Sequence, residues 1–345
     1  MAQTITIALD AMGGDYGVNS VIPGAALCLK GNPDLRFLLF GDRAQIEPVL
    51  QVHDDLRRVS EIVHTDSYIK SDEKPSVALR ASKGTSMRLA IEAVLNGKAD
   101  AIVSAGNTGA LMALAKMVLK TVPGIHRPAI ASLWPTDRGS SVMLDLGANV
   151  LVDAENLAQF AVLGSVFAKA HNDDISVPTV GLLNVGTEDA KGPDHVRGAA
   201  EILSNVEFPG HYYGFVEGTD ITKGTVDVIV CDGYAGNIAL KTAEGVGKFF
   251  GDRLKESLKS GVFSMLGAMI AGGSLKLFKN RVDPRLYNGG VFLGLNGLCI
   301  KSHGGCDPLA FSSAVNLSIE LARHSYVEIV TNDINNLISQ ESFLS

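Results

Sequence analysis

Several features that commonly reveal a protein's chemistry are missing from this sequence. It has only four cysteines and no CxxC pair, which suits reduced thiols better than a disulfide framework. Its 345 residues carry a net charge of −7, so the surplus of basic residues that nucleic-acid binding needs is absent. No apolar run approaches the roughly 20 residues that span a bilayer, and residues 1–10 lack the features of a signal peptide. We therefore expect a cytoplasmic protein that binds no nucleic acid.

Familiar catalytic motifs are missing as well. No G-x-G-x-x-G follows an apolar run, and neither the P-loop pattern G-x-x-x-x-G-K-[ST] nor the nucleophile elbow G-x-S-x-G occurs. Cys299, His303 and Cys306 lie close together, but this crowding and the lack of a fourth ligand are poor spacing for zinc. We expect neither a metal nor an organic cofactor, and we interpret this segment as small residues in a tight loop.

The chain does contain apolar runs that alternate with helical patterns. Continuous Val, Ile and Leu runs are typical of strands that are covered on both faces. They predict an α/β fold with a largely parallel sheet inside helical layers, formed by residues 1–345 as a single two-lobed unit. The predicted strands are 4–10, 35–41, 58–64, 100–105, 129–134, 141–146, 179–185, 212–217 and 227–231, and the helical patterns include 83–96, 108–120, 155–170, 194–204, 236–259 and 307–338.

Glycines and small polar residues follow five of the predicted strands. The segments are 10–17, 104–109, 145–149, 184–192 and 232–237. In parallel sheets ligands bind at the carboxyl ends of strands, where glycine allows close approach to the backbone and Asn, Ser or Thr can form hydrogen bonds. Each segment alone is more typical of an ordinary βα turn. Together they predict one shared cleft.

Residues 99–110 contain the clearest binding motif. An apolar run ends in Ser104 and Gly106, and a helical pattern starts at Thr108. A strand that enters a helix in this way directs free main-chain N–H groups and the positive end of the helix at one place, which suits an anion such as phosphate. Because no other segment offers an obvious nucleophile, we expect the chemistry to depend on a bound anion.

Residues 253–285 form a segment of a different kind. Seven basic residues there outnumber two acidic ones, and residues 262–271 carry no charge. An apolar stretch flanked by lysines is typical of a segment that lies in the lipid interface, and dimer packing is the alternative. Both roles can coexist. The residues that we expect to contact a membrane or an acyl chain are Val262, Phe263, Leu266, Met269 and Ile270.

Eight short strings resemble a known family, in order, over roughly residues 5–315. They are IALDAMGGD at 7–15, KPSVALR at 74–80, SMR at 86–88, SAGNTGALM at 104–112, LDLGAN at 144–149, NVGTE at 184–188, VCDGYAGN at 230–237 and KSHG at 301–304. The family is that of the phosphate acyltransferases, or acyl-[acyl-carrier-protein]:phosphate transacylases (PlsX). The resemblance implies the fold of isocitrate and isopropylmalate dehydrogenases and of phosphotransacetylase. It also implies a homodimer that associates peripherally with the inner face of the cell membrane.

The reaction implied by the resemblance moves a long-chain fatty acyl group from acyl carrier protein to inorganic phosphate. The product is acyl phosphate for phosphatidic acid and phospholipid synthesis, and its consumer is an acyl-phosphate glycerol-3-phosphate acyltransferase. Phosphate is already a nucleophile at neutral pH, so such an enzyme must position the anion and stabilise the oxyanion rather than supply a serine, a cysteine or a metal.

The resemblance and the motifs together suggest roles for particular residues. Lys191 or Lys241 would add positive charge at the phosphate, and Asp232 and Asn237 would orient a lysine or the thioester carbonyl. His303 is either the acid that protonates the departing thiolate or a structural histidine. The residues expected to bind phosphate are Ser104, Gly106, Asn107, Thr108, Asn184, Gly186 and Thr187, of which Asn107 and Asn184 are also expected to act in catalysis.

Three other classes of protein stay open at this point. A metal-dependent decarboxylating dehydrogenase shares the implied fold, but it would need an aspartate cluster and an adenine site that are not found in the sequence. A small-acyl phosphotransacylase that uses coenzyme A also shares the fold. A non-catalytic scaffold that binds acyl chains or membranes is the option without enzyme activity.

Overall fold

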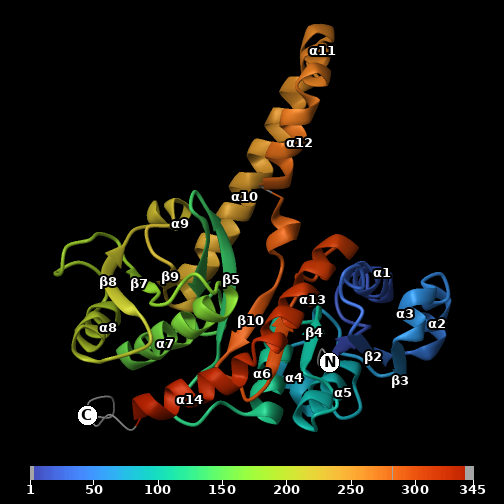
Figure 1. The fold of residues 1–345 in the computed structure, drawn as a ribbon, viewed down its shortest axis with the longest axis horizontal. Coiled ribbons are helices and arrows are strands. Elements are labelled where there is room, and N and C mark those ends of the chain that lie inside the picture. The colour runs from blue at the N-terminus through green and yellow to red at the C-terminus, as the bar shows by residue number, and fades with distance from the viewer. Residues whose placement is uncertain (1–3, 282, 339–345) are drawn as a thin grey trace.

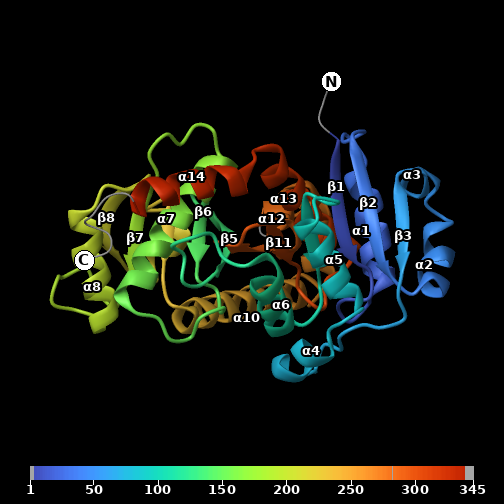
Figure 2. The same cartoon turned by 90° about the horizontal axis from the view of Figure 1, so that it is seen from below.

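One sheet of eleven strands runs through the body of the protein (Figures 1 and 2). This is a computed structural model, and it describes residues 4–281 and 283–338. The strand order is β3-β2-β1-β4-β11-β10-β5-β6-β9-β7-β8. The strands are β1 (Ile5–Asp10), β2 (Leu35–Gly41), β3 (Ser60–His64), β4 (Ala101–Ser104), β5 (Ala129–Thr136), β6 (Gly139–Leu144), β7 (Thr179–Leu183), β8 (His211–Val216), β9 (Val228–Val230), β10 (Gly290–Leu293) and β11 (Leu298–Lys301).

Helices cover both faces of this sheet, as predicted for an α/β fold. In the first half of the chain they are α1 (Val18–Cys28), α2 (Arg43–Leu50), α3 (Asp54–Arg58), α4 (Pro75–Ala81), α5 (Ser86–Leu95), α6 (Thr108–Leu119) and α7 (Ala154–His171). In the second half they are α8 (Asp194–Asn205), α9 (Asp220–Lys223), α10 (Gly233–Leu258), α11 (Val262–Ile270), α12 (Gly272–Arg281), the 3-10 helix η1 (Pro284–Tyr287), α13 (Pro308–Arg323) and α14 (Tyr326–Ile338).

The strands fall into two parallel groups of opposite direction. In the first group β3, β2, β1, β4 and β11 are parallel, and in the second β6, β9, β7 and β8 are parallel. The antiparallel strands β10 and β5 lie between the groups, so the second group is reversed. Six steps separate β1 from β9 in the sheet, and twist of roughly 20–25° per step adds up to about 120–150°. Twist of this size offsets most of the reversal in strand direction between the two groups.

Alternating side chains of the buried strands enter two apolar cores. On β1, Ile5, Ile7 and Leu9 pack in the core that also contains α1, α7, α8 and α13, whereas Ala8 packs in the core with α5 and α6. On β4, Ile102 joins this second core. Successive side chains of a strand point to opposite faces, so a strand that is apolar at every position must be covered on both sides.

The expected alternation of strands and helices is confirmed, with three differences. Strands β10 and β11 were not predicted, and each is defined by its pairing with β5 or β4. The helical pattern at 307–338 forms two helices, α13 and α14, because Ser325 takes a positive φ of 49° between them. The sheet is parallel within each group but mixed overall.

The helices α10, α11 and α12 form an arm that projects far from the body, with α11 at its far end (Figure 1). Side chains from 241 to 278 are nearly all exposed, including Phe249, Phe250 and Leu254 on α10. The predicted apolar stretch at 262–271 therefore forms the tip of this arm. Among the residues described, no helix is both long enough and apolar enough to cross a bilayer.

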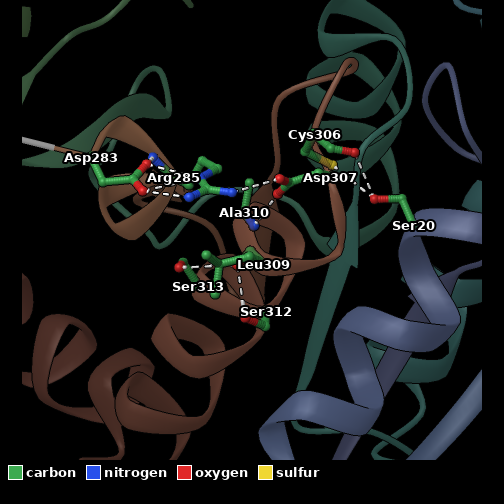
Figure 3. Close-up of polar contacts among 9 residues, drawn as sticks. All are labelled: Ser20, Asp283, Arg285, Cys306, Asp307, Leu309, Ala310, Ser312 and Ser313. Atoms are coloured by element: carbon green, nitrogen blue, oxygen red, sulfur yellow. Dashed lines mark hydrogen bonds and ion pairs between the residues drawn. The ribbon is translucent and has the colours of Figure 1, made fainter. Parts of the chain in front are cut away.

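The base of the arm is tied to the body by charged groups (Figure 3). The Arg285 guanidinium pairs with Asp283 at 2.6 Å and with Asp307 at 3.0 Å. Asp307 in turn caps the N-terminus of α13, since its carboxylate accepts a hydrogen bond from the Ala310 N–H at 2.9 Å. These pairs fix the segment that returns from α12 to the sheet.

A substitution at Gly164 tests how α7 packs on the sheet. A Cβ there would lie 2.6 Å from a methyl of Val228 and 2.9 Å from a methyl of Leu144. We expect Gly164→Ala to lower the free energy of unfolding by about 1–3 kcal/mol, measured by chemical denaturation. Gly218→Ala is the matched control, because its Cβ would meet nothing within 4 Å. Equal stability of the two variants would contradict the close packing of α7.

Candidate functional site

A buried carboxylate lies at the centre of the first group of strand ends. Asp10, at the end of β1, is 1% exposed, and its two oxygens each accept a hydrogen bond at 2.7 Å, one from the Ser86 hydroxyl and one from the Ser104 hydroxyl. Burial raises the pKa of Asp10, while the two hydroxyl bonds oppose this effect. The carboxylate thereby joins β1, β4 and the start of α5.

Three segments meet around Asp10, namely 10–15 after β1, 104–107 after β4 and 301–305 after β11. The Asp15 N–H donates to the Gly304 carbonyl at 2.8 Å, and the Ser302 N–H donates to the Ser104 carbonyl at 2.9 Å. A Cβ on Gly13 would lie 2.7 Å from an Asp10 oxygen and 2.8 Å from the Gly106 nitrogen. Only glycine fits so close an approach of two turns.

The turn at 104–108 has the geometry of an anion site. The Gly106 N–H donates to the Ser104 hydroxyl at 3.0 Å, and α6 begins at Thr108. Within the described part of the chain, the N–H groups of Thr108 and Gly109 have no acceptor. These unpaired donors, with the positive end of the helix dipole behind them, favour a negatively charged ligand.

Asn107 holds this turn in place with every polar group of its side chain. Its Oδ1 accepts from the Ala110 N–H at 2.9 Å, as an N-cap does, and its Nδ2 donates to the carbonyls of Ser71 and Glu73, both at 2.9 Å. The amide therefore also binds the segment before α4 to the anion turn. In this structure Asn107 has no spare side-chain donor for phosphate.

Lys301, at the end of β11, is a site residue that the sequence interpretation missed. Its ammonium donates to the Ala105 carbonyl at 3.3 Å and to the Ser302 carbonyl. Burial lowers the pKa of Lys301 to about 8, although Cys306, Asp10 and Asp15 nearby act in the opposite direction. The apolar run before it is only three residues long, which is why the strand and its terminal lysine were overlooked.

The second group of strand ends carries its own buried carboxylate. Burial raises the pKa of Asp145, which accepts hydrogen bonds from the N–H groups of Ile130, Ala148 and Asn149 at 2.6–3.0 Å. The predicted cleft residue Asn237 donates to the Leu146 carbonyl at 3.3 Å, so it packs against this turn.

Asp232 and Lys241 lie on or next to α10, which follows β9. Asp232 caps the helix through the Ala235 N–H at 2.7 Å, and its other oxygen is 3.4 Å from Nε2 of His195, a neighbour that the sequence did not reveal. Lys241 is half-exposed and pairs with Glu244 at 2.7 Å. Its positive charge is a minor influence that lowers the pKa of Lys301.

The segment 184–192 after β7 is largely bonded to itself. Asn184 is 9% exposed, and its Nδ2 donates to the Lys191 carbonyl at 3.0 Å. Lys191 pairs with Glu188 at 2.7 Å and packs along Gly186, while Thr187 is exposed. Within the described residues no hydrogen bond or ion pair joins this segment to the turn at 104–108.

His303 lies in the first group, on the loop after β11. Its N–H donates to Oδ1 of Asn288 at 3.0 Å, and its Nδ1 accepts from the Gly305 N–H at 3.2 Å. Asn288 also donates to the Ser302 hydroxyl at 2.8 Å. The histidine is exposed, and a proton on Nε2 can reach a ligand without breaking the Nδ1 contact.

The described groups around the turn suit anion binding, and two buried thiols of the chain are disfavoured as nucleophiles. Burial raises the pKa values of the Cys231 and Cys299 thiols, which disfavours their thiolates. Across 4–281 and 283–338, no group of three or more His, Cys, Asp or Glu side chains is arranged to hold a metal ion. The groups that remain are main-chain N–H donors, hydroxyls and lysines, which can position an anionic reactant and stabilise an oxyanion.

Comparisons with known proteins point to one chemistry. Residues 5–328 match the model of a family described as "Fatty acid synthesis protein". The chain is 50% identical over 338 residues to a phosphate acyltransferase of Parvibaculum lavamentivorans, which covers 98% of this chain and 93% of that one. It is 50% identical over 337 residues to a phosphate acyltransferase of Rhodospirillum centenum, with 98% and 95% covered.

Solved structures show the same fold at lower identity. A phosphotransacetylase from Streptococcus pyogenes superposes with a TM-score of 0.61 at 20% identity, covering 93% of this chain and 95% of that one. The EutD phosphotransacetylase from Staphylococcus aureus gives a TM-score of 0.56 at 17% identity, with 94% of each chain covered.

Removing one of the two serine hydroxyls that donate to Asp10 tests the hydrogen-bond network around this carboxylate. In Ser86→Ala one carboxylate oxygen loses its donor in a buried site, so we expect the free energy of unfolding to fall by about 1–3 kcal/mol in chemical denaturation. Ser313→Ala is the control, because that exposed hydroxyl makes only a 3.4 Å contact with the Leu309 carbonyl. If both variants unfold like the unmodified protein, the Asp10 network does not stabilise the fold.

Proposed function

This chain belongs to the phosphate acyltransferase family, and we propose that it transfers a long-chain fatty acyl group from acyl carrier protein to inorganic phosphate. The family resemblance of the sequence is thereby confirmed, and the protein is an acyltransferase. The observation that supports the proposal most directly is the turn at 104–108. It presents unpaired main-chain N–H groups beside a half-buried lysine, and no activated side-chain nucleophile accompanies it.

The proposed reaction needs no acyl-enzyme intermediate. An oxygen of phosphate attacks the thioester carbonyl, a C–O bond forms, and the tetrahedral oxyanion collapses as the C–S bond breaks. The carrier's thiolate then takes a proton, for which the exposed ring of His303 is the candidate donor. Acyl phosphate leaves as a mixed anhydride, ready for an acyl-phosphate glycerol-3-phosphate acyltransferase in phospholipid synthesis.

Each predicted site residue takes a role that its contacts allow. We assign phosphate to the turn of Ser104, Gly106 and Thr108, which Asn107 supports through its side-chain bonds. The segment that contains Asn184, Gly186, Thr187 and Lys191 forms a second wall of the cleft, with Asn184 acting through the loop shape that it maintains. Asp232 orients the start of α10, Asn237 packs beside it, and Lys241 adds positive charge toward Lys301.

We further propose that the arm serves both membrane association and dimerisation. Val262, Phe263, Leu266, Met269 and Ile270 at its tip are between 50% and 90% exposed. An exposed apolar surface of this kind is typical of an interaction site, and flanking lysines favour an anionic lipid surface. Lower on the arm, Val246, Phe250 and Leu254 recur every four residues along α10, a spacing that suits helix pairing with a second copy.

Substitution of Asn107 tests the phosphate turn. Asn107→Ala loses the cap and both carbonyl contacts, whereas Asn107→Asp keeps an N-cap acceptor but cannot donate to Ser71 and Glu73. We expect turnover to fall by roughly ten- to a hundredfold in both, because small displacements of a positioned reactant cost rate in this range. The assay follows release of free thiol from acyl carrier protein thioester with and without phosphate.

The control for this experiment is Asn205→Ala, which removes an exposed amide at the end of α8. We expect it to leave turnover unchanged. Asn184→Ala is expected to lower turnover as Asn107→Ala does, and unchanged kinetics in both would remove these two residues from the site. If the unmodified protein releases no thiol in a phosphate-dependent way, it is a scaffold. If it prefers a short-chain coenzyme A thioester, it is a small-acyl phosphotransacylase.

A charge at the tip of the arm tests membrane association separately. We expect the double variant Leu266→Glu and Ile270→Glu to lose co-sedimentation with anionic phospholipid vesicles, because carboxylates disfavour insertion and repel the surface. The control is Val52→Glu with Val177→Glu, two exposed apolar residues of the body. If the tip variant pellets with vesicles as well as this control does, the tip is not the membrane contact.

A further inference from the structure

The ammonium of Lys301 contacts neutral main-chain groups. Both acceptors of its ammonium, the carbonyls of Ala105 and Ser302, are neutral main-chain groups. Within the described residues no carboxylate lies within ion-pair distance of Lys301, which differs from Lys191 and Lys241, each paired with a glutamate at 2.7 Å. An ammonium has three protons to donate, so one of them is left for a further partner.

The surrounding network places this ammonium beside the anion turn. Asp10 accepts hydrogen bonds from the hydroxyls of Ser86 and Ser104, and the Lys301 ammonium donates to the Ala105 and Ser302 carbonyls rather than to this carboxylate. Ser104 accepts from the Gly106 N–H, which shapes the turn around Ala105. The carbonyl that binds Lys301 is therefore only three residues before Thr108, whose N–H is unpaired.

Charged and titratable groups from several elements face this lysine. Asp10 at the end of β1, Asp15 in the loop after it and Cys306 after β11 favour the ammonium, while Lys241 on α10 disfavours it. Burial is the largest influence and lowers the pKa of Lys301 to about 8, so the group is mostly charged at neutral pH and loses its proton just above it. A bound phosphate dianion would supply the missing negative charge and favour the ammonium.

We infer that Lys301 is the residue that binds the phosphate nucleophile through its charge, together with the main-chain N–H groups of Thr108 and Gly109. This inference rests on the proposed function and adds the identity of its cationic phosphate ligand. Lys301 suits the role better than Lys191 or Lys241, because those two are half-exposed and already paired. Asp10 and Ser104 are positioning residues that hold the turn against the ammonium.

The test compares Lys301→Met and Lys301→Arg with the unmodified protein in the full phosphate-dependent reaction. In Lys301→Met we expect the KM for phosphate to rise by roughly 10- to 100-fold, the range for losing a charged hydrogen bond. The KM for the carrier thioester should change less than threefold. Lys116→Met, which removes an exposed lysine of α6, is the matched control and should keep both values.

A pH profile distinguishes this role from a structural one. In the unmodified protein kcat/KM for phosphate should fall as the pH rises through about 8, because the free enzyme then loses the ammonium. The descending limb should be missing in Lys301→Met and should move to higher pH in Lys301→Arg, whose guanidinium stays protonated. A rise of kcat/KM with pH that comes from the ionisation of phosphate itself should be the same in the unmodified protein and in both Lys301 variants.

A direct measurement of phosphate binding tests the role of Lys301 without relying on the proposed acyl transfer. Calorimetric titration with inorganic phosphate alone, without a thioester, should show binding to the unmodified protein and a loss of roughly 10-fold or more in Lys301→Met. A folded Lys301→Met protein with unchanged phosphate affinity and an unchanged pH profile would overturn the inference. If Lys301→Met does not fold, a second measurement replaces it. In that case, an unmodified protein whose kcat/KM for phosphate does not fall as the pH rises through about 8 would overturn the inference. Phosphate binding without thiol release would instead contradict the proposed function alone.

Discussion

The buried carboxylate of Asp10 is the interaction on which the first group of strand ends depends. A carboxylate that is 1% exposed is costly unless its oxygens are paired, and here two hydroxyls satisfy them at 2.7 Å. Those hydroxyls come from the start of α5 and from the end of β4, so the pairing requires these elements to meet at one place. The anion turn, the glycines that approach it and the lysine beside it all follow from this meeting.

The second constraint is the reversal of strand direction in the middle of the sheet. Strands β10 and β5 join two parallel groups that would otherwise carry their loops to opposite edges. Sheet twist offsets much of this reversal, so the two groups differ less in strand direction than their pairing alone implies.

Much of this architecture and part of the site could be predicted from residue patterns. The apolar runs located nine of the strands, and the start of α6 at Thr108 was predicted from the helical pattern that follows the glycines. The assignment of an anion to 104–109 stays a prediction. Two residues show where such patterns stop. The binding of phosphate by Asn107 stays a prediction, but no local pattern revealed that its side-chain amide is bonded to Ser71, Glu73 and Ala110. Lys301 was missed because its short strand depends on pairing with β4.

The sequence by itself determined which segments are buried on both faces, where glycine must stand, and that a charge-free stretch lies between basic residues at 253–285. These properties are local, because side-chain polarity and backbone freedom belong to each residue. Only the tertiary structure decided which strand ends lie around Asp10, which groups the Lys301 ammonium contacts, and that the apolar stretch ends a projecting arm. Such properties arise from contacts between residues distant along the chain, as between Lys301 and Ala105, and no local pattern encodes those distances.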